Sequence, residues 1–503
     1  MSVCLIPDVW EEICQHLQRG DLHNICLTSR TLNHIGTLYL YRRIQWDWND
    51  KNSRKRIMEL WTTLMQDEGK RRRLCGYVQE VQLQMRSPPE GTAAILKSPE
   101  IQKRYRRRAS EVKMPFYWEM NYLRGVVSSV IQDHKVREAW DKYIVARNPY
   151  ALVALLLPFL HNLRSLQLDY LFLIKGGLPA EMINYLTSGT KIESAELRNN
   201  LGHLETMDYG TNAVNLNLTT RFESERQYNL RHYATQFIPI FRLQNVKHLR
   251  IWLRSWNNLH LKRLIGFETD YTALESLVLD HISVKECSFL EILQGMKNLR
   301  SLHLGFNVED RTHWVESQRP TQADQARLSN GLQALYKCLE HLSISLHTTP
   351  DDREQVSEDI VFKALFENLT AEFFRSFTRL KTLELPIRIL NGFEDIAEVG
   401  INRELPATLE RLGLRWDFRH MGMFKEEKPD TVGDLKEIVA EFLQSPGRHL
   451  RVPLLQEVII RLWVSDDELD KTLKDCDDLI EEFNIHVGVR FDLMRPGLWT
   501  KGP

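Results

Sequence analysis

The sequence predicts an α/β protein in which a small N-terminal helical module precedes an irregular solenoid of stacked helix–strand units. Three observations predict this fold class. Apolar residues recur at helical spacing in residues 6–35. A nine-residue apolar template recurs through most of the remaining chain. The stretches between its copies are polar and uneven in length, as surface loops are.

The template has apolar residues at positions 1, 4, 7 and 9. Positions 7 and 9 alternate with one other residue, the period of a strand with one buried face, whereas positions 1 and 4 are spaced as in a helical turn. Stacked units of this kind bury a core that no single unit could bury alone. We therefore expect parallel strands on a concave side and helices on a convex side. The clear copies are LHNLRSLQL (160–168), LQNVKHLRI (243–251), YTALESLVL (271–279), MKNLRSLHL (296–304), YKCLEHLSI (336–344), FTRLKTLEL (377–385), PATLERLGL (406–414) and VPLLQEVII (452–460).

Three further stretches extend this array. CGYVQEVQL (75–83) fits as an early copy, and TKIESAELR (190–198) fits weakly. Residues 465–483 have approximate helical spacing and residues 484–493 alternate, so they are expected to close the array as a final helix–strand unit. The expected domains are a helical module over 1–45, a basic helical and loop region over 46–150 with a strand near 75–83, and the repeat domain over 151–503.

The N-terminal module is expected to contain three small helices. Pro7 suits the first turn of a helix, Gly20 ends that helix, and Asp21 begins a second. Ser29 then leads into a third. So small a bundle cannot hide all its apolar residues, and an exposed remainder indicates a partner surface.

These N-terminal residues resemble an F-box motif, whose usual form is Leu-Pro, an acidic residue, spaced aliphatic residues, Asp-Leu and a Ser-Arg or Ser-Lys pair. Here Ile replaces the leucine before the proline, and Tyr41 stands near a position where tryptophan is common. The template resembles a leucine-rich repeat, although the asparagine or cysteine expected after the strand is matched only near Cys287 and Asn307. The matching F-box residues are Ile6, Pro7, Ile13, Leu17, Asp21, Leu22, Ile25, Leu27, Ser29, Arg30 and Leu32.

The resemblance implies a non-catalytic substrate-recognition subunit of a cullin-RING ubiquitin ligase. Its F-box would dock onto the Skp adaptor, and its repeats would capture a protein substrate that the sequence does not identify. An alternative is an F-box scaffold that is not coupled to degradation. By this resemblance the adaptor-binding residues are Leu5, Ile6, Pro7, Ile13, Leu17, Leu22, Ile25 and Leu27, with burial inside the bundle as the competing role.

The concave strand face is the expected substrate surface. Residues between and after the template leucines are expected to be exposed there, and a register slip of one residue would exchange the two faces. Arginine and tryptophan are enriched at binding hot spots. The candidate substrate-binding residues are therefore Arg250, Trp252, Arg254, Arg415, Arg461 and Trp463, and Asp169, Arg198 and Asp280 are expected on the same face.

Composition also indicates the cellular location and bears on membrane and nucleic-acid binding. Seven scattered cysteines favour reduced thiols in the cytoplasm or nucleus. No secretory signal is recognised, and the apolar run Ala151–Leu157 is too short to cross a membrane, so it is expected to be a buried helix. The basic runs 70–73 and 103–108 leave open a nucleic-acid-associated protein, although a solvated loop is favoured.

Catalytic and metal-binding motifs are not found. The chain has no phosphate-binding glycine loop, nucleophile elbow or HExxH motif, so we expect no catalytic residues, no metal and no cofactor. Cys338, His341 and His347 have a weak resemblance to a metal-ligand set, but Cys338 lies inside a repeat copy, where packing is the favoured role.

Overall fold

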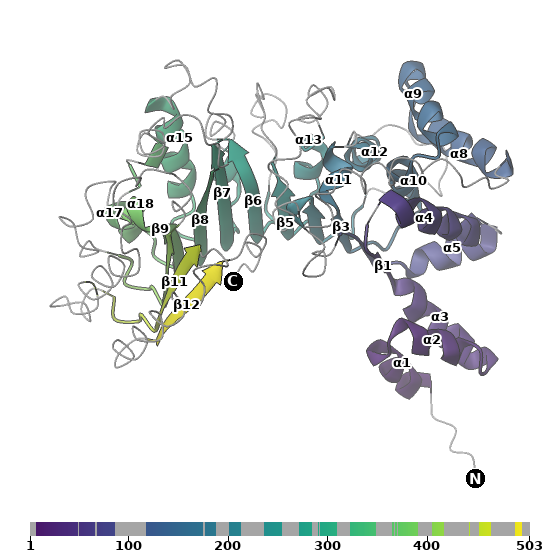
Figure 1. The fold of residues 1–503 in the computed structure, drawn as a ribbon, viewed down its shortest axis with the longest axis horizontal. Helices are drawn as coiled ribbons and strands as arrows, with labels where there is room; N and C mark the ends of the chain where they lie inside the picture. The colour runs from purple at the N-terminus through teal and green to yellow at the C-terminus, as the bar shows by residue number, and fades with distance from the viewer. Residues whose placement is uncertain are drawn as a thin grey trace, which may run out of the picture. The chain divides into compact units, whose positions relative to one another are not determined.

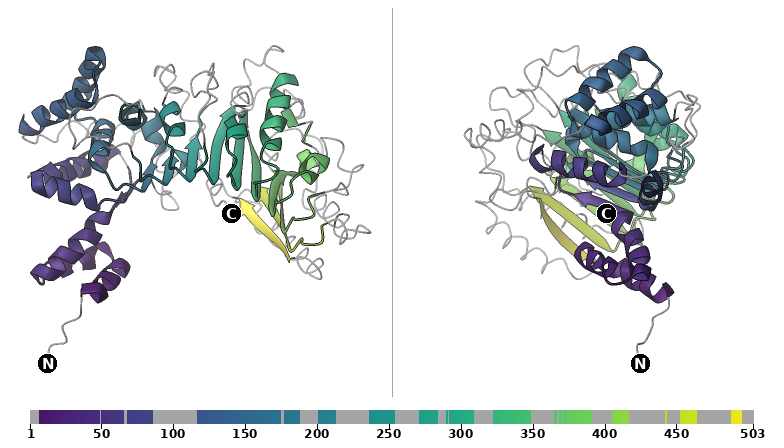
Figure 2. Two further views of the ribbon diagram at one scale, coloured as in Figure 1. Left: turned by 180° about the vertical axis from the view of Figure 1, so that it is seen from behind. Right: turned by 90° about the vertical axis from the view of Figure 1, so that its right-hand side faces the viewer.

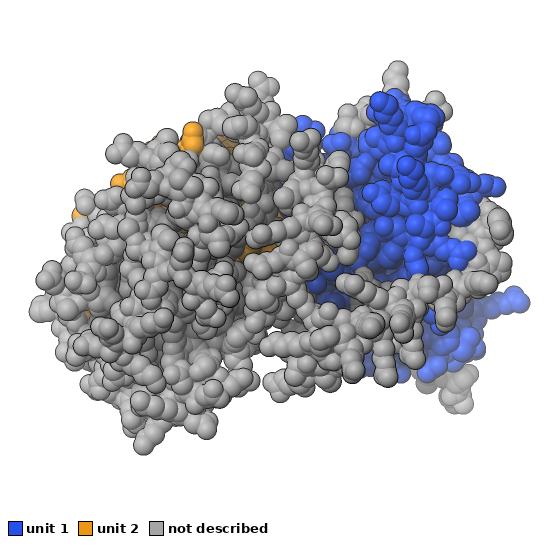
Figure 3. Space-filling model, turned by 45° about the horizontal axis from the view of Figure 1, so that its top comes forward, with its two compact units in different colours: residues 1–212, 229–246 blue, residues 213–228, 247–503 orange. Residues whose placement is uncertain are grey.

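A computed structural model of the chain divides into two compact units, which are described separately (Figure 3). Unit 1 comprises residues 1–212 and 229–246, and unit 2 comprises residues 213–228 and 247–503. The structure describes residues 7–48, 50–65, 68–85, 117–174, 177–187, 201–212, 236–253, 271–283, 290, 292–308, 322–348, 365–366, 368–369, 371–390, 405–416, 442, 452–463 and 488–494.

Unit 1 begins with three helices, as predicted, but the predicted boundary between the first two is wrong. The helices are α1 (Pro7–His16), α2 (Arg19–Cys26) and α3 (Arg30–Arg42). Gly20 and Asp21 both lie inside the second helix, which begins at Arg19 after the N-cap residue Gln18. Ser29 caps α3, since its Oγ accepts a hydrogen bond from the Leu32 amide at 3.2 Å. Cys14, Leu22 and Ile35 form the buried core of this three-helix module, against which Trp10, Leu17, Ile25, Tyr39 and Leu40 pack.

The third helix continues directly into a strand without a loop. Helix α3 ends at Arg42, and β1 (Arg43–Trp46) begins at the next residue. The carbonyl of Arg42 accepts a hydrogen bond from the Gln79 amide at 2.8 Å, just before β2 (Glu80–Leu83). The three-helix module is therefore joined to the first strand by continuous, hydrogen-bonded backbone (Figure 1).

The strands of unit 1 are parallel and follow chain order. They are β1, β2, β3 (Ser165–Leu168) and β4 (Thr206–Tyr209), and their register aligns Ile44, Val81, Leu166 and Met207. These four side chains are buried, as a strand with one apolar face requires.

Helices of unit 1 supply the rest of its core. Trp48, Trp61 and Trp140 are fully buried among them. Every residue of α10 (Pro149–Leu156) is buried apart from its first, which confirms the buried helix expected over 151–157. The other helices are α4 (Asp50–Met65), α5 (Glu68–Tyr77), α8 (Tyr117–Val130), α9 (His134–Val145), η1 (Leu157–Phe159), α11 (Tyr170–Ile174), α12 (Leu178–Thr187) and α13 (Ile238–Phe241).

Within the described ranges, no helix combines the length and the apolar character that crossing a lipid bilayer requires.

Unit 2 contains a longer parallel sheet, also built in chain order (Figures 1 and 2). Its register aligns the seventh template residue of successive units, so Leu277, Leu302, Leu342 and Leu383 lie side by side and are buried. The strands are β5 (His248–Trp252), β6 (Ser276–Ser283), β7 (Ser301–Val308), β8 (His341–Thr348), β9 (Thr382–Pro386), β10 (Arg411–Trp416), β11 (Glu457–Trp463) and β12 (Gly488–Met494).

Helices lie along one side of this sheet, as Figure 1 shows for α15 (Gln322–Gln333), α17 (Ala371–Arg375) and α18 (Ile387–Leu390). Leu328 and Leu332 of α15 are fully buried. The predicted α/β class and the parallel, solenoid-like arrangement of strands are therefore confirmed.

A repeated hydrogen-bond pattern precedes strands β3, β4 and β6 to β11. The carbonyl of the fifth template residue accepts from two successive amides of the next unit; thus Glu275 O accepts from Arg300 N at 2.8 Å and Ser301 N at 3.0 Å. Asparagine at template position 3 reinforces the stacking, since Asn298 Nδ2 donates to the Thr272 carbonyl at 2.6 Å. Asn162 and Asn245 donate in the same way.

The structure adds one unit to the predicted array. The sequence LGHLETMDY (201–209) leads into β4 and fits the template, with Met207 and Tyr209 at the strand positions. The weak copy predicted at 190–198 lies outside the described residues, as does the predicted final helix over 465–483. The last described strand, β12, overlaps the strand predicted over 484–493.

Candidate functional site

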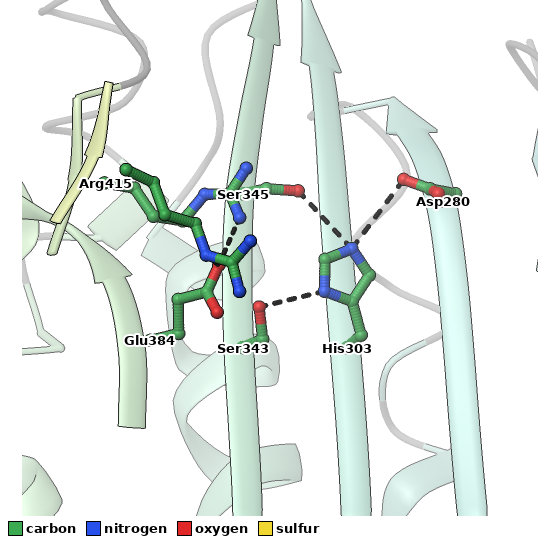
Figure 4. Close-up of polar contacts among 7 residues, drawn as sticks. Asp280, His303, Ser343, Ser345, Glu384 and Arg415 are labelled. Carbon is green, nitrogen blue, oxygen red and sulfur yellow. Dashed lines mark hydrogen bonds and ion pairs between the residues drawn. The ribbon is translucent and has the colours of Figure 1, made fainter. Parts of the chain in front are cut away.

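The face of the unit 2 sheet opposite the template leucines carries a row of polar side chains (Figure 4). Strand residues alternate between the two faces, so template positions 8 and 10 both point away from the leucine core. Adjacent strands thereby bring together residues from six different repeat units. The members are Asp280 on β6, His303 on β7, Ser343 and Ser345 on β8, Glu384 on β9, Arg415 on β10 and Arg461 on β11.

His303 is the centre of the first half of this row. Its Nδ1 lies 3.0 Å from Ser343 Oγ, and its Nε2 lies 3.5 Å from Ser345 Oγ and 3.8 Å from Asp280 Oδ1 (Figure 4). The imidazole side chain is 20% exposed, while the Asp280 carboxylate is almost fully buried.

This Asp–His–Ser grouping differs from a hydrolytic triad in three respects. The 3.8 Å between Asp280 and His303 is longer than the hydrogen bond that orients a catalytic imidazole. Ser343 is buried, whereas a nucleophile must reach its substrate. Backbone amides in the middle of a parallel sheet are engaged in the ladder and cannot form an oxyanion hole. The geometry therefore suits a polar surface network better than acyl transfer.

Glu384 is the centre of the second half. Its carboxylate pairs with Arg415 Nη1, and its Oε1 lies 3.1 Å from Arg461 Nε. Burial alone raises the pKa of Glu384, but the guanidinium groups of Arg415 and Arg461 outweigh that effect, so its pKa lies below the ordinary value. Glu384 is therefore a permanently charged carboxylate at neutral pH.

Gly413 makes this arrangement sterically feasible. It is the register partner of Glu384 on the adjacent strand β10. A Cβ atom at Gly413 would lie 2.7 Å from Glu384 Cγ and 2.9 Å from its Cβ. A glycine is thus required where the Glu384 side chain crosses β10 toward Arg461.

The expectation that the predicted substrate-binding residues are exposed is wrong for several of them. Trp252 is 5% exposed and its ring lies 5.0 Å from that of His281, which has a positive φ of 63° beside a register shift in β6. Arg415 is 3% exposed, and Asp280 is buried as well. They are buried because each packs against polar or aromatic groups of neighbouring strands.

The remaining predicted substrate-binding residues have different placements. Arg250 and Arg461 are half-buried on the same face. Trp463 belongs to β11, but its side chain is outside the described part of the chain, as are Arg254 and Arg198. Among the candidates whose side chains the structure describes, Arg415 and Arg461 are brought together through Glu384.

Asp169 was also expected to be exposed, and that expectation is wrong. It follows β3 directly and is fully buried. Its Oδ2 accepts hydrogen bonds from the Met85 amide at 2.7 Å and from Asn212 Nδ2 at 2.6 Å, and its Oδ1 accepts from the Leu171 amide at 2.9 Å. Asp169 thus satisfies backbone groups where three strands end, a role that the sequence prediction had given to asparagine or cysteine.

The three-helix module holds the predicted adaptor-binding residues in contrasting environments. Leu22 is in the module's own core, and Ile13, Leu17 and Ile25 are half-buried. Leu27, by contrast, is 73% exposed directly after α2. Pro7 is the first residue of α1, and Leu5 and Ile6 lie outside the described residues.

The basic run 70–73 belongs to α5 and is partly structural. Arg71 is buried, and its guanidinium carbon lies 5.1 Å from the Tyr122 ring centre and 5.6 Å from that of Phe159. Arg72 pairs with Glu68 at 2.8 Å. The second run, 103–108, lies outside the described residues.

Metal-ligating residues do not gather in the described part of the chain, where no group of three or more His, Cys, Asp or Glu side chains is arranged to hold an ion. Cys338 is half-buried, and its thiol donates to the Leu335 carbonyl at 3.4 Å. Burial raises the pKa of this thiol.

In comparisons with known proteins, no protein-family model and no curated protein matches this chain.

Proposed function

We propose that this protein is a non-catalytic substrate-recognition subunit of a cullin-RING ubiquitin ligase, with an F-box over the three-helix module and leucine-rich repeats over the parallel sheets. The observation that carries the proposal is the exposed Leu27. The module already has a core of Cys14, Leu22 and Ile35, so a large aliphatic side chain left 73% exposed beside it suits a partner surface.

The connection between α3 and β1 supports this assignment. A ligase subunit must hold its target at a fixed position relative to the adaptor. The backbone passes from Arg42 to Arg43 without a loop, and Arg42 is hydrogen-bonded to Gln79 beside β2. Such a connection transmits orientation better than a flexible linker does.

The polar face of unit 2 is the proposed target-binding surface. It offers donors and acceptors from several strands at once, and Arg461 and His303 retain partial exposure. Buried Arg415 and Glu384 would act there indirectly, by fixing the position of Arg461. Protein targets with polar or charged segments fit this surface better than apolar ones do.

The test is co-expression of the full chain with the Skp adaptor, followed by size-exclusion chromatography. Leu27→Asp is expected to abolish a 1:1 complex and leave the fold intact, because the side chain is exposed. Leu454→Asp is the matched control, since Leu454 is 50% exposed in unit 2 and should bind as the wild type does. A folded wild type that forms no complex would remove the F-box assignment.

A scaffold role without degradation is distinguished by a second measurement. If the adaptor complex forms, target proteins should become ubiquitinated in a reconstituted ligase and should accumulate in cells that express the Leu27→Asp variant. Stable binding with no ubiquitination or turnover would favour the scaffold.

A further inference from the structure

We draw no further inference here: the strongest candidate, the side-chain cluster of Asp280, His303, Ser343 and Ser345 on the polar face of unit 2, belongs to the site already described, and nothing in the structure shows what binds to it.

Discussion

Glu384 and Arg461 form an ion pair across an entire intervening strand. Glu384 lies on β9 and Arg461 on β11, yet Oε1 of the first lies 3.1 Å from Nε of the second. Gly413 on β10 leaves the space between them. Together with Arg415, they place a buried carboxylate between two guanidinium groups in the polar face of unit 2.

Glu384→Gln should destabilise unit 2 strongly. The change leaves the buried Arg415 guanidinium without the carboxylate beside it, and removing one partner of a buried pair costs about 3–5 kcal/mol. Urea denaturation measures the loss. The matched control is Glu80→Gln, which breaks the exposed pair with Arg43 and should cost about 1 kcal/mol or less. Equal losses for both variants would contradict the role of the Glu384 pair.

The contribution of Glu384 should also depend on pH. Its folded-state pKa is lower than its unfolded-state value, so the folded protein holds the ionised form more tightly. The stabilisation is therefore complete above the ordinary carboxyl value and is lost as the pH falls through the lowered folded pKa. The stability difference between the wild type and Glu384→Gln should be constant near neutrality and shrink on acidification below about pH 4.3. If this stability difference grew on acidification, the predicted direction of the Glu384 pKa shift would be contradicted.

Gly413→Ala should destabilise the protein although alanine is small. The new methyl would overlap Glu384 Cγ at 2.7 Å, and Glu384 is held by its two arginines, so relief is restricted. We expect a loss of about 1–3 kcal/mol in the free energy of unfolding. Gly76→Ala is the control, because no atom lies within 4 Å of its added Cβ and alanine favours helix α5. Thermal denaturation of both variants measures the difference, and Gly76→Ala should be neutral or stabilising.

Asp169→Ala should loosen the strand ends of unit 1. It removes the acceptor for the Met85 and Leu171 amides, and each buried amide left unsatisfied costs about 1–3 kcal/mol. Hydrogen exchange at these two amides should accelerate. Gln167→Ala, at a half-buried position in the same strand, should leave their exchange rates unchanged. Unaltered exchange in Asp169→Ala would show that other groups hold this turn.

The sequence predicted the strands better than it predicted the polar face. Leucine at template positions 7 and 9 is a strong signal, because only a strand with one buried face alternates in that way. The unit at 201–209 was missed since Met207 and Tyr209 replace the aliphatic residues. Template alternation does show that Asp280 and Arg415 share a face, but burial of that face depends on contacts between strands from distant units.

The prediction that Asp169 is exposed was wrong because it relied on residue type. A charged residue after a strand is usually solvated, whereas here three donors surround the carboxylate. The sequence signal that could have identified this environment is Asn212, which stands three residues after β4 as Asp169 stands directly after β3. Asn162, Asn245 and Asn298 were a second signal, because asparagine recurs at one template position to bind the preceding unit.

The charges at template position 5 alternate in sign along unit 2, which has a consequence for how such an array can change in length. In strand order these residues are Lys247, Glu275, Arg300, Glu340, Lys381 and Glu410. Removing one helix–strand unit, such as the one that carries Arg300, would bring Glu275 next to Glu340 and set two carboxylates side by side. Removing two neighbouring units would keep unlike charges adjacent. Loss of internal units from this sheet should therefore be tolerated better in adjacent pairs than singly, whereas a unit at either end of the row could be lost without setting like charges side by side.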